Sequence, residues 1–394
     1  MLDAAIAGAP PKELPRALAS DACSQALFSI LVEGLADRFE PALCDAYARL
    51  FSQAIAHVTP ETDAGWLAAR YERVRRPRPI IGKPHRVFVL SRVSLGADVA
   101  VTSILLAAAK RRFPHAELFF VGPRKNYELF AGDPHVHHAP IEYHRGSLRD
   151  RLAVWEELKA LVSAGDSVAI DPDSRLTQLG LLSICPESFH HLFESRSYGA
   201  GSAASLSDLA ASWAAETFGI TGAKPFVALG HLTHYPKPYI AVSLGVGENP
   251  AKRLPDPFEE ELLRLLARTG LPLIVDEGAG GEEAERVERA VERAGAAAGA
   301  TLWDGSFSGF ARIIARARLY VGYDSAGQHV AAASDVPLIS IFAGFPVPRF
   351  YDRWSPAGPQ ATVVRVDRPD AQEVLWRVRE ALGRIVEIPG AAAE

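Results

Sequence analysis

The residues best suited to chemistry in this sequence form a four-residue turn, Asp324-Ser325-Ala326-Gly327. An apolar run over 319–322 predicts a strand before the turn, and the composition of 328–333 predicts a helix after it. The first N–H groups of a helix have no partner within the helix, and the helix dipole adds positive charge there, so this turn could bind a diphosphate. Asp324 and Ser325 are also common helix caps, and the local pattern favours neither interpretation over the other.

Alternating strands and helices place this turn within a larger α/β arrangement. In the second half of the chain, strands are expected at 239–244, 271–275, 300–303, 319–321, 338–342 and 361–366, with helices at 258–267, 282–295, 310–315 and 371–382. In the first half, strands are expected at 86–90, 116–122, 167–171 and, from a weaker pattern, near 186–189, with helices at 99–110, 124–130, 148–162 and 206–218. The pattern predicts two doubly wound parallel sheets, in which ligands bind at the carboxyl ends of the strands.

A helical periodicity without strand signals occupies residues 13–76, where Leu27, Leu31 and Leu35 recur at four-residue steps. We therefore predict an all-α N-terminal domain over 1–79, a Rossmann-like domain over 80–236 and a second Rossmann-like domain over 237–394. A Pro- and His-rich linker at 231–238 separates the last two. Five arginines between 70 and 78 are expected to form a solvated face rather than a contact with an anionic acceptor or with lipid headgroups.

Composition limits the classes of partner and site. The net charge of −5 and the pI near 6.2 argue against nucleic-acid binding, which needs a clustered basic surface. The three cysteines are far apart, so we expect neither disulfides nor a zinc site, and a reducing cytoplasm is the natural setting. The sequence lacks a signal-peptide pattern and an apolar run of the ~20 residues that a membrane span needs, so we expect a soluble protein that is at most peripheral at the cytoplasmic membrane face. Histidines at 135, 137, 138 and 144 lack the spacing of a metal site, and we interpret them as a solvated loop.

Three motifs, in order along the chain, resemble a known family. Residues 94–99 read SLGADV and precede Thr102 and KRRFP at 110–114; residues 243–255 read SLGVGENPAKRLP; residues 324–332 read DSAGQHVAA before a Pro-bearing strand. The chain resembles the lipopolysaccharide heptosyltransferases, inverting glycosyltransferases with two Rossmann-like domains in the GT-B arrangement. The resemblance covers residues 86–366 and leaves the helical segment outside. The chain departs from the family at Ala97, which is inserted or replaces a glycine, and at Val101, Leu254 and Ala326.

The resemblance implies roles for individual residues. Asp98 matches the family's base, which takes the proton of the attacking acceptor hydroxyl, although an N-cap of helix 99–110 would occupy the same position. Lys252 is the expected counter-charge to the leaving diphosphate, and Arg253 either assists it or is a solvated neighbour. The expected donor-binding residues are Gly245, Gly247, Lys252, Arg253, Glu277, Glu282, Asp324, Ser325, Ala326, Gly327 and His329. The expected acceptor-binding residues are Ser94, Gly96, Asp173 and Arg175.

The sequence and its resemblance together predict an inverting glycosyltransferase without an essential metal or other cofactor. By resemblance the donor is a nucleotide diphosphate sugar similar to ADP-heptose, and the acceptor is a hydroxyl of a glycan, glycolipid or protein. Two other classes stay open: a non-catalytic nucleotide-sugar-binding or scaffold protein, and a sugar-nucleotide epimerase of the same fold. An epimerase is expected to need a further acid pair in the first Rossmann-like domain, and a scaffold would tolerate the loss of Asp98 and Lys252.

Overall fold

Two parallel β-sheets, one in each of two structural units, organise the chain in the computed structural model. The structure describes residues 2–163, 166–230, 238–247, 249–295 and 299–386. Unit 1 comprises residues 1–225 and 347–354, and unit 2 comprises residues 226–346 and 355–394. The predicted boundary at 236 and most of the linker 231–238 lie outside the described residues, so the division into three domains stays a prediction.

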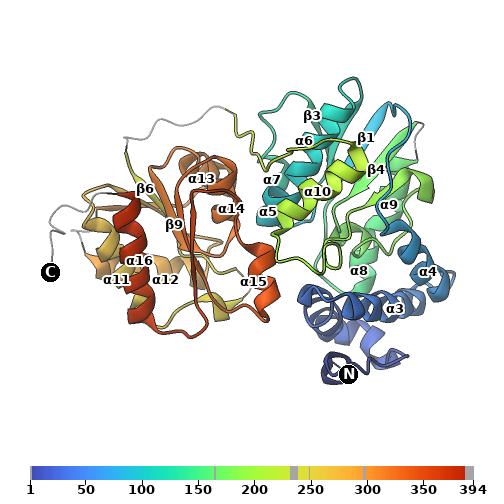
Figure 1. The fold of residues 1–394 in the computed structure, drawn as a ribbon. Helices are drawn as coiled ribbons and strands as arrows, with labels where there is room; N and C mark the ends of the chain where they lie inside the picture. The colour runs from blue at the N-terminus through green and yellow to red at the C-terminus, as the bar shows by residue number, and fades with distance from the viewer. Residues whose placement is uncertain (1, 164–165, 231–237, 248, 296–298, 387–394) are drawn as a thin grey trace. The chain divides into compact units, whose positions relative to one another are not determined.

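The sheet of unit 1 has five parallel strands in the order β3-β2-β1-β4-β5. The strands are β1 (Arg86–Leu90), β2 (Glu117–Gly122), β3 (Val136–Pro140), β4 (Ser167–Asp171) and β5 (His190–Leu192). The central strands β1 and β4 are apolar and buried almost throughout, as strands covered on both faces must be. Figure 1 shows the strands among the helices α5 (Leu95–Ala97), α6 (Ser103–Arg112), α7 (Arg124–Tyr127), α8 (Leu148–Leu152), α9 (Val154–Val162) and α10 (Leu206–Phe218).

Helices form the N-terminal part of unit 1, as predicted. They are α1 (Leu2–Ile6), α2 (Ser24–Phe28), α3 (Pro41–Val58) and α4 (Ala64–Val74), with short 3-10 or π-helical turns at 16–19, 21–23, 29–33 and 36–38. Their buried side chains form one hydrophobic core with Leu148, Leu179 and Leu192 of the sheet region. The helical segment therefore packs on the first sheet through a shared core.

The arginines at the end of this segment are only in part the solvated face that the sequence predicted: Arg73 and Arg76 are exposed, whereas Arg70 and Arg78 bind to the rest of unit 1. Arg70 is fully buried, donates hydrogen bonds to the carbonyls of Gly180 and Leu181, and contacts His190 Nδ1. Arg78 Nη2 donates to His190 O at 2.7 Å. Because a buried guanidinium needs hydrogen-bond acceptors, these contacts fasten the helical segment to β5 and to the chain before it.

The sheet of unit 2 has six parallel strands in the order β11-β10-β9-β6-β7-β8. The strands are β6 (Ile240–Ser243), β7 (Leu273–Asp276), β8 (Ala300–Trp303), β9 (Leu319–Tyr323), β10 (Leu338–Phe342) and β11 (Ala361–Arg365). The helices are α11 (Phe258–Ala267), α12 (Glu282–Ala294), α13 (Phe307–Ile314), α14 (Ala326–Ala333) and α16 (Ala371–Ile385). Because β6 and β9 are parallel neighbours, the motifs that follow them, residues 243–255 and 324–332, begin side by side at the carboxyl edge of this sheet.

Two strands of unit 1 differ from the sequence prediction. Two of the histidines interpreted as a solvated loop, His137 and His138, lie in the edge strand β3. His138 donates a hydrogen bond to Gly122 O and stacks on Tyr127. Its polar sequence hides the strand, because an edge strand needs less apolar surface than a central one. The strand expected near 186–189 is a 3-10 turn, and β5 begins just after it at His190.

A short helix, α15 (Pro348–Trp354), gives no signal in the sequence pattern. Although it lies between β10 and β11 along the chain, it belongs to unit 1. Arg353 is buried and donates to the carbonyls of Gly199 and Ala204, and Arg349 donates to Phe39 O at 2.8 Å. These contacts attach α15 to unit 1.

Candidate active site

The turn after β1 carries Asp98, the predicted base. Asp98 Oδ1 accepts hydrogen bonds from the Arg92 N–H at 2.7 Å and from Thr102 Oγ1 at 2.6 Å. Asp98 Oδ2 accepts from Ser91 Oγ and from Asn126 Nδ2, both at 2.6 Å. The side chain is completely buried, and this burial raises the pKa of the Asp98 carboxyl although the four hydrogen bonds act to lower it. The carboxylate is therefore held in one orientation by groups from β1's turn, the following helix and α7.

The alternative that Asp98 caps a helix is wrong. The helix begins at Leu95 with Ser94 as its N-cap residue, and the Asp98 N–H bonds to Ser94 O inside the first turn. A π-helical turn over 98–102 continues the helix into α6. Ser94 is exposed and Gly96 is half-buried, so these two predicted acceptor residues lie on the first turn of this helix, just before Asp98.

The turn after β4 is joined to the turn after β1 by hydrogen bonds. We call residues 91–98 the β1 turn and residues 172–174 the β4 turn. Arg92 Nη1 donates to Pro172 O at 2.6 Å, and Ser174 Oγ donates to Ser91 O. The Ser174 N–H in turn donates to the Asp171 carboxylate at 2.7 Å. Two turns from neighbouring strands thus form one structure at the carboxyl edge of the sheet, where α/β folds bind ligands.

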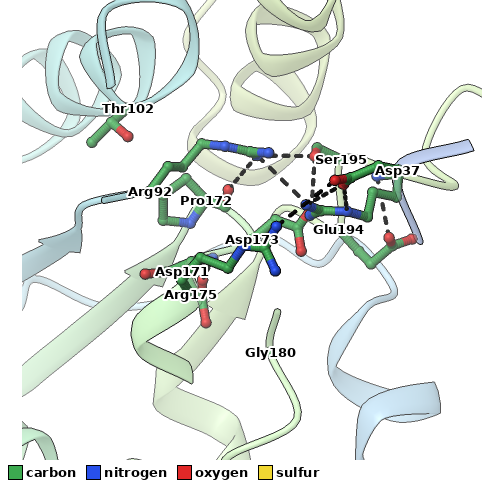
Figure 2. Close-up of polar contacts among 12 residues, drawn as sticks. Asp37, Arg92, Thr102, Asp171, Pro172, Asp173, Arg175, Gly180, Glu194 and Ser195 are labelled. Carbon is green, nitrogen blue, oxygen red and sulfur yellow. Dashed lines mark hydrogen bonds and ion pairs between the residues drawn. The ribbon is translucent and has the colours of Figure 1, made fainter. Parts of the chain in front are cut away.

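A network of charged side chains extends from the β4 turn (Figure 2). Asp173 Oδ2 pairs with Arg196 and lies 3.8 Å from Arg92 Nη1. Arg196 also donates to Asp37 Oδ1 through Nε and Nη2, at 3.0 and 2.9 Å. Arg175 Nη2 lies 3.7 Å from Asp37 Oδ2. The acceptor-binding role of Asp173 and Arg175 stays a prediction, and in the structure both side chains take part in this ion-pair network.

Backbone strain marks the same two turns. Val93 has φ +65° and Asp173 has φ +68°, in the left-handed region that side chains rarely adopt. Val93 is held there by a hydrogen bond from its N–H to Ser91 Oγ at 2.8 Å. Strain of this kind persists only where the surroundings enforce it, and it is concentrated at functional sites.

A hollow of about 480 Å³ opens beside Val93 in unit 1. Its lining residues are Val93, Pro123, Arg124, Lys125, Glu128, Glu142, Tyr143 and Arg145. They follow the carboxyl ends of β1, β2 and β3. The volume lies in the range of about 300–1,000 Å³ that is typical of small-molecule sites.

In unit 2, Lys252 reaches the predicted diphosphate turn. It ends a 3-10 turn over 250–252, whose start is capped by Asn249 Oδ1 accepting from the Ala251 N–H. Lys252 Nζ donates to Asp324 Oδ2 at 2.8 Å and to Asp324 O at 2.9 Å. Asp324 Oδ1 accepts from Gln328 Nε2 on the first turn of α14. The Asp324 carboxylate therefore fixes the ammonium group beside the N-terminus of α14.

The side chains of Asp324 and Ser325 do not cap α14. Ser325 is the N-cap residue, yet it makes no side-chain cap hydrogen bond, and its Oγ lies 3.4 Å from Tyr320 Oη. Elsewhere in the chain, Ser205 and Ser306 do bond to the first turns of their helices. A Cβ at Gly327 would come within 2.3 Å of Tyr320 Oη, so only glycine fits there. The first turn of α14, which starts at residue 326, thus keeps the anion-binding capacity of a helix end.

Glu283, which the sequence analysis did not select, connects the loops after β6 and β7. Its Oε2 accepts from the Val246 N–H at 3.2 Å, and its Oε1 accepts from the Ala279 N–H at 3.0 Å. A Cβ at Gly245 would come within 3.1 Å of Glu283 Oε1, and Gly247 has φ +58°. Both glycines therefore have a structural reason to lie in this loop.

The two acids expected to bind the donor, Glu277 and Glu282, differ in solvent exposure. Glu282 is exposed at the first position of α12, whereas Glu277 is half-buried and its N–H donates to Trp303 O at 3.0 Å. Asp276 ends β7, and burial raises the pKa of its carboxyl to about 6. Glu282 and Glu283 are adjacent glutamates near the start of α12, so residue type alone does not show which of the two contacts the loops after β6 and β7.

Arg253 and His329 differ from Lys252 in their charge environment. Arg253 pairs with Asp256 and, at 3.4 Å, with Glu259, so its guanidinium is engaged by local carboxylates. His329 is buried, and burial lowers the pKa of its imidazole to about 4, which leaves it neutral at pH 7. A neutral imidazole can form a hydrogen bond but supplies no charge, so Lys252 is the cation of this turn.

The described part of the chain has neither a metal-binding cluster nor a membrane-spanning helix. No group of three His, Cys, Asp or Glu side chains there is arranged to hold a metal ion. Each helix among the described residues is too short or too polar to cross a membrane.

Three solved structures share the fold. The chain is similar to E. coli heptosyltransferase WaaC with ADP-2-deoxy-2-fluoro heptose, with a TM-score of 0.57 and 19% identity over 76% of this chain and 99% of that chain. The chain is also similar to the glycosyl transferase family 9 protein from Veillonella parvula DSM 2008, with a TM-score of 0.54 and 14% identity over 79% of this chain and 92% of that chain. The third structure, E. coli ADP-heptose lps heptosyltransferase II, has a TM-score of 0.51 and 19% identity over 76% of this chain and 98% of that chain. These likenesses confirm the predicted fold class: two Rossmann-like domains of the GT-B type preceded by helices.

The family follows from the sequence of the second half. No curated protein matches the chain. Residues 187–379 match the sequence model of glycosyltransferase family 9 (heptosyltransferase), which includes the segments that carry Lys252 and Asp324. Residues 187–379 therefore form a domain of the heptosyltransferase family, and this match supports a nucleotide-sugar glycosyltransferase.

Proposed function

We propose that the chain transfers a sugar, with inversion at the anomeric carbon, from an ADP-heptose-like donor to a hydroxyl acceptor. The observation that carries the donor part is the Lys252 ammonium, which Asp324 holds at the N-terminus of α14. A departing diphosphate gains negative charge, and a fixed cation beside helix N–H groups stabilises it without reorganisation. The names of two similar structures support the choice of donor, because one contains ADP-2-deoxy-2-fluoro heptose and the other is an ADP-heptose heptosyltransferase.

We assign the nucleoside to the carboxyl end of β7. The diphosphate turn follows β9, and β9, β6 and β7 are consecutive neighbours in the sheet. Adjacent strands are about 4.8 Å apart, so the end of β7 lies two strand spacings, about 10 Å, from the diphosphate turn, within the reach of a nucleoside. The carboxylates of Asp276 and Glu277 lie at this end and can accept hydrogen bonds from ribose hydroxyls.

We propose Asp98 as the base. It takes the proton of the acceptor hydroxyl while that oxygen attacks the anomeric carbon and the bond from this carbon to the diphosphate oxygen breaks, with the electron pair leaving on the diphosphate. Burial, by raising the pKa of Asp98, strengthens its hold on a proton. Because four donors occupy its oxygens, the acceptor hydroxyl must displace one of them to reach the carboxylate.

We assign the acceptor to the hollow beside Val93, because this hollow adjoins the β1 turn. The cations Arg124, Lys125 and Arg145 outnumber the acids Glu128 and Glu142 in its lining, which favours a glycan, glycolipid or protein acceptor that carries an anionic group near the reacting hydroxyl. A cytoplasmic location and a peripheral contact with the membrane belong to the same proposal.

Calorimetric titration with ADP tests the donor site. Lys252→Met is expected to weaken ADP binding about ten- to hundredfold, because a hydrogen bond to a charged group contributes about 1.5–3 kcal/mol. Arg253→Met is the matched control, since this neighbouring cation is already engaged by Asp256 and Glu259; its effect should stay below about threefold. Equal effects of the two substitutions would place the diphosphate elsewhere.

The stereochemistry of the product tests the reaction class. A thermal-shift panel of nucleotide sugars selects the donor, and NMR of the transfer product gives its anomeric configuration. We expect the configuration opposite to that of the donor. Retention of configuration would refute the inverting reaction, and a panel in which no nucleotide diphosphate sugar stabilises the protein would refute the donor class.

A further inference from the structure

The N-terminal helical segment lies outside the residues that match family 9, yet it supplies a carboxylate to the network around the β4 turn. Asp37 lies in the 3-10 turn Ala36–Arg38, 159 positions before Arg196 in the sequence. Two nitrogens of Arg196 donate to Asp37 Oδ1. The Arg196 side chain is only 6% exposed, and a buried charge that loses one of its two carboxylate partners is left with less compensation. The position of Arg196 therefore depends on Asp37.

The same network leads from Arg196 to the proposed base. Arg196 pairs with Asp173, whose left-handed backbone needs support from its contacts. The β4 turn that contains Asp173 accepts a hydrogen bond from the Arg92 guanidinium at Pro172 O. The N–H of Arg92 donates to Asp98 Oδ1. Each step is a direct contact between buried groups, so a displacement of Arg196 is transmitted to the β1 turn.

The turn that carries Asp37 is itself fixed on its other side. Phe39, which ends this turn with φ +59°, packs edge-on against Phe350 of α15 with ring centres 6.1 Å apart. Its carbonyl accepts from Arg349. The Trp354 ring of the same helix lies 5.7 Å from the Arg92 guanidinium carbon. The helical segment and α15 therefore support the β1 turn together.

We propose that Asp37 is a positioning residue for sugar transfer: it fixes Arg196 and Asp173, which hold Arg92 and thereby the β1 turn where Asp98 acts. The proposal rests on the role proposed above for Asp98. It makes the N-terminal helical segment a part of the catalytic unit, rather than an appendage that only recruits partners.

Steady-state kinetics of Asp37→Asn tests the proposal. The amide keeps the shape of the side chain and removes its charge, so we expect kcat to fall about ten- to hundredfold while KM for the nucleotide sugar stays within about twofold, because a misplaced base slows chemistry and not donor binding. Asp37→Glu restores the charge and should recover part of kcat. The control is Asp45→Asn, because Asp45 pairs with Arg75 at 2.6 Å in the same segment but outside the network.

Hydrogen exchange of the amides of residues 91–98 gives a readout that does not need activity. Asp37→Asn should speed this exchange, and Asp45→Asn should leave it unchanged. If Asp37→Asn matches the control in both kcat and exchange, the positioning role is wrong. If the wild-type protein transfers no sugar while exchange responds as expected, the proposed function fails and the contact chain from Asp37 to the β1 turn still holds.

Discussion

Alanine and asparagine at position 98 would disturb the surroundings of Asp98 differently, which separates its catalytic role from its structural role. In Asp98→Ala, the Arg92 N–H, the Asn126 amide and the hydroxyls of Ser91 and Thr102 all lose their acceptor. A buried polar group without a partner costs about 1–3 kcal/mol, so the four together predict a loss of at least about 4 kcal/mol in the free energy of unfolding.

The asparagine substitution should cost much less. An amide nitrogen in place of Asp98 Oδ2 would face the Asn126 amide nitrogen, but Asn126 can turn its side chain over. Asn126 Oδ1 is buried and has no hydrogen-bond partner among the residues that the structure describes, so after this turn it accepts from the new amide. The bonds then change from charged to neutral, and a loss of about 1–2 kcal/mol is expected. Transfer should nevertheless fall about 10²–10⁴-fold, the usual contribution of a general base.

Guanidinium unfolding and single-turnover transfer, measured on the same preparations, check both parts. The expected result for Asp98→Asn is a nearly stable protein with almost no transfer. Transfer within about tenfold of wild type by this variant would show that another group takes the proton. A loss of stability below about 1 kcal/mol in Asp98→Ala would show that the four hydrogen bonds do not hold the turn.

Two further predictions concern pH and packing. Burial raises the pKa of the Glu194 carboxyl from 4.5 to about 7. Between these two pH values the folded protein holds a proton that the unfolded chain releases. The stability that this proton contributes is therefore complete below pH 4.5 and is lost as the pH rises through 7. Unfolding of wild type and Glu194→Gln at several pH values should show this loss in wild type only, and parallel pH profiles would contradict it. Gly327→Ala drives a Cβ into Tyr320 Oη and should destabilise the protein by about 1–3 kcal/mol and weaken ADP binding, whereas Gly383→Ala, with open space around it, should do neither.

The fold was predictable wherever residue patterns are local. The strand β1 is a run of apolar residues that is buried from Val87 to Leu90, and such a run has few other solutions in an α/β chain. The strand β3 was missed because its sequence, VHHAP, buries only Val136 and Ala139 at the sheet edge and carries little apolar signal. The helix α15 was missed because its stability comes from contacts of Arg349 and Arg353 with residues far away in the sequence.

The site was predictable only where a motif and a strand end coincide. Lys252 and Asp324 are 72 positions apart. The local pattern suggested the diphosphate turn at Asp324, and the resemblance added Lys252; their direct hydrogen bond follows from the pairing of β6 with β9. The pair of Asp37 and Arg196 has no such signal, since neither residue lies in a motif and 159 positions separate them. Glu283 was missed because no sequence signal shows that its side chain, rather than that of Glu282, turns back to the loops after β6 and β7.

The π-helical turn at Asp98 accounts for the departure from the family motif at Ala97. The family pattern has glycine directly before the aspartate, whereas here Ala97 stands between Gly96 and Asp98. The Ser103 N–H bonds to Asp98 O, five residues back, so this turn contains one residue more than an α-helical turn. We infer that Ala97 is an insertion, because this longer turn gives one extra residue a place in the helix. The backbone of one helical turn absorbs the extra residue, and Thr102 Oγ1 still donates to the Asp98 carboxylate across it.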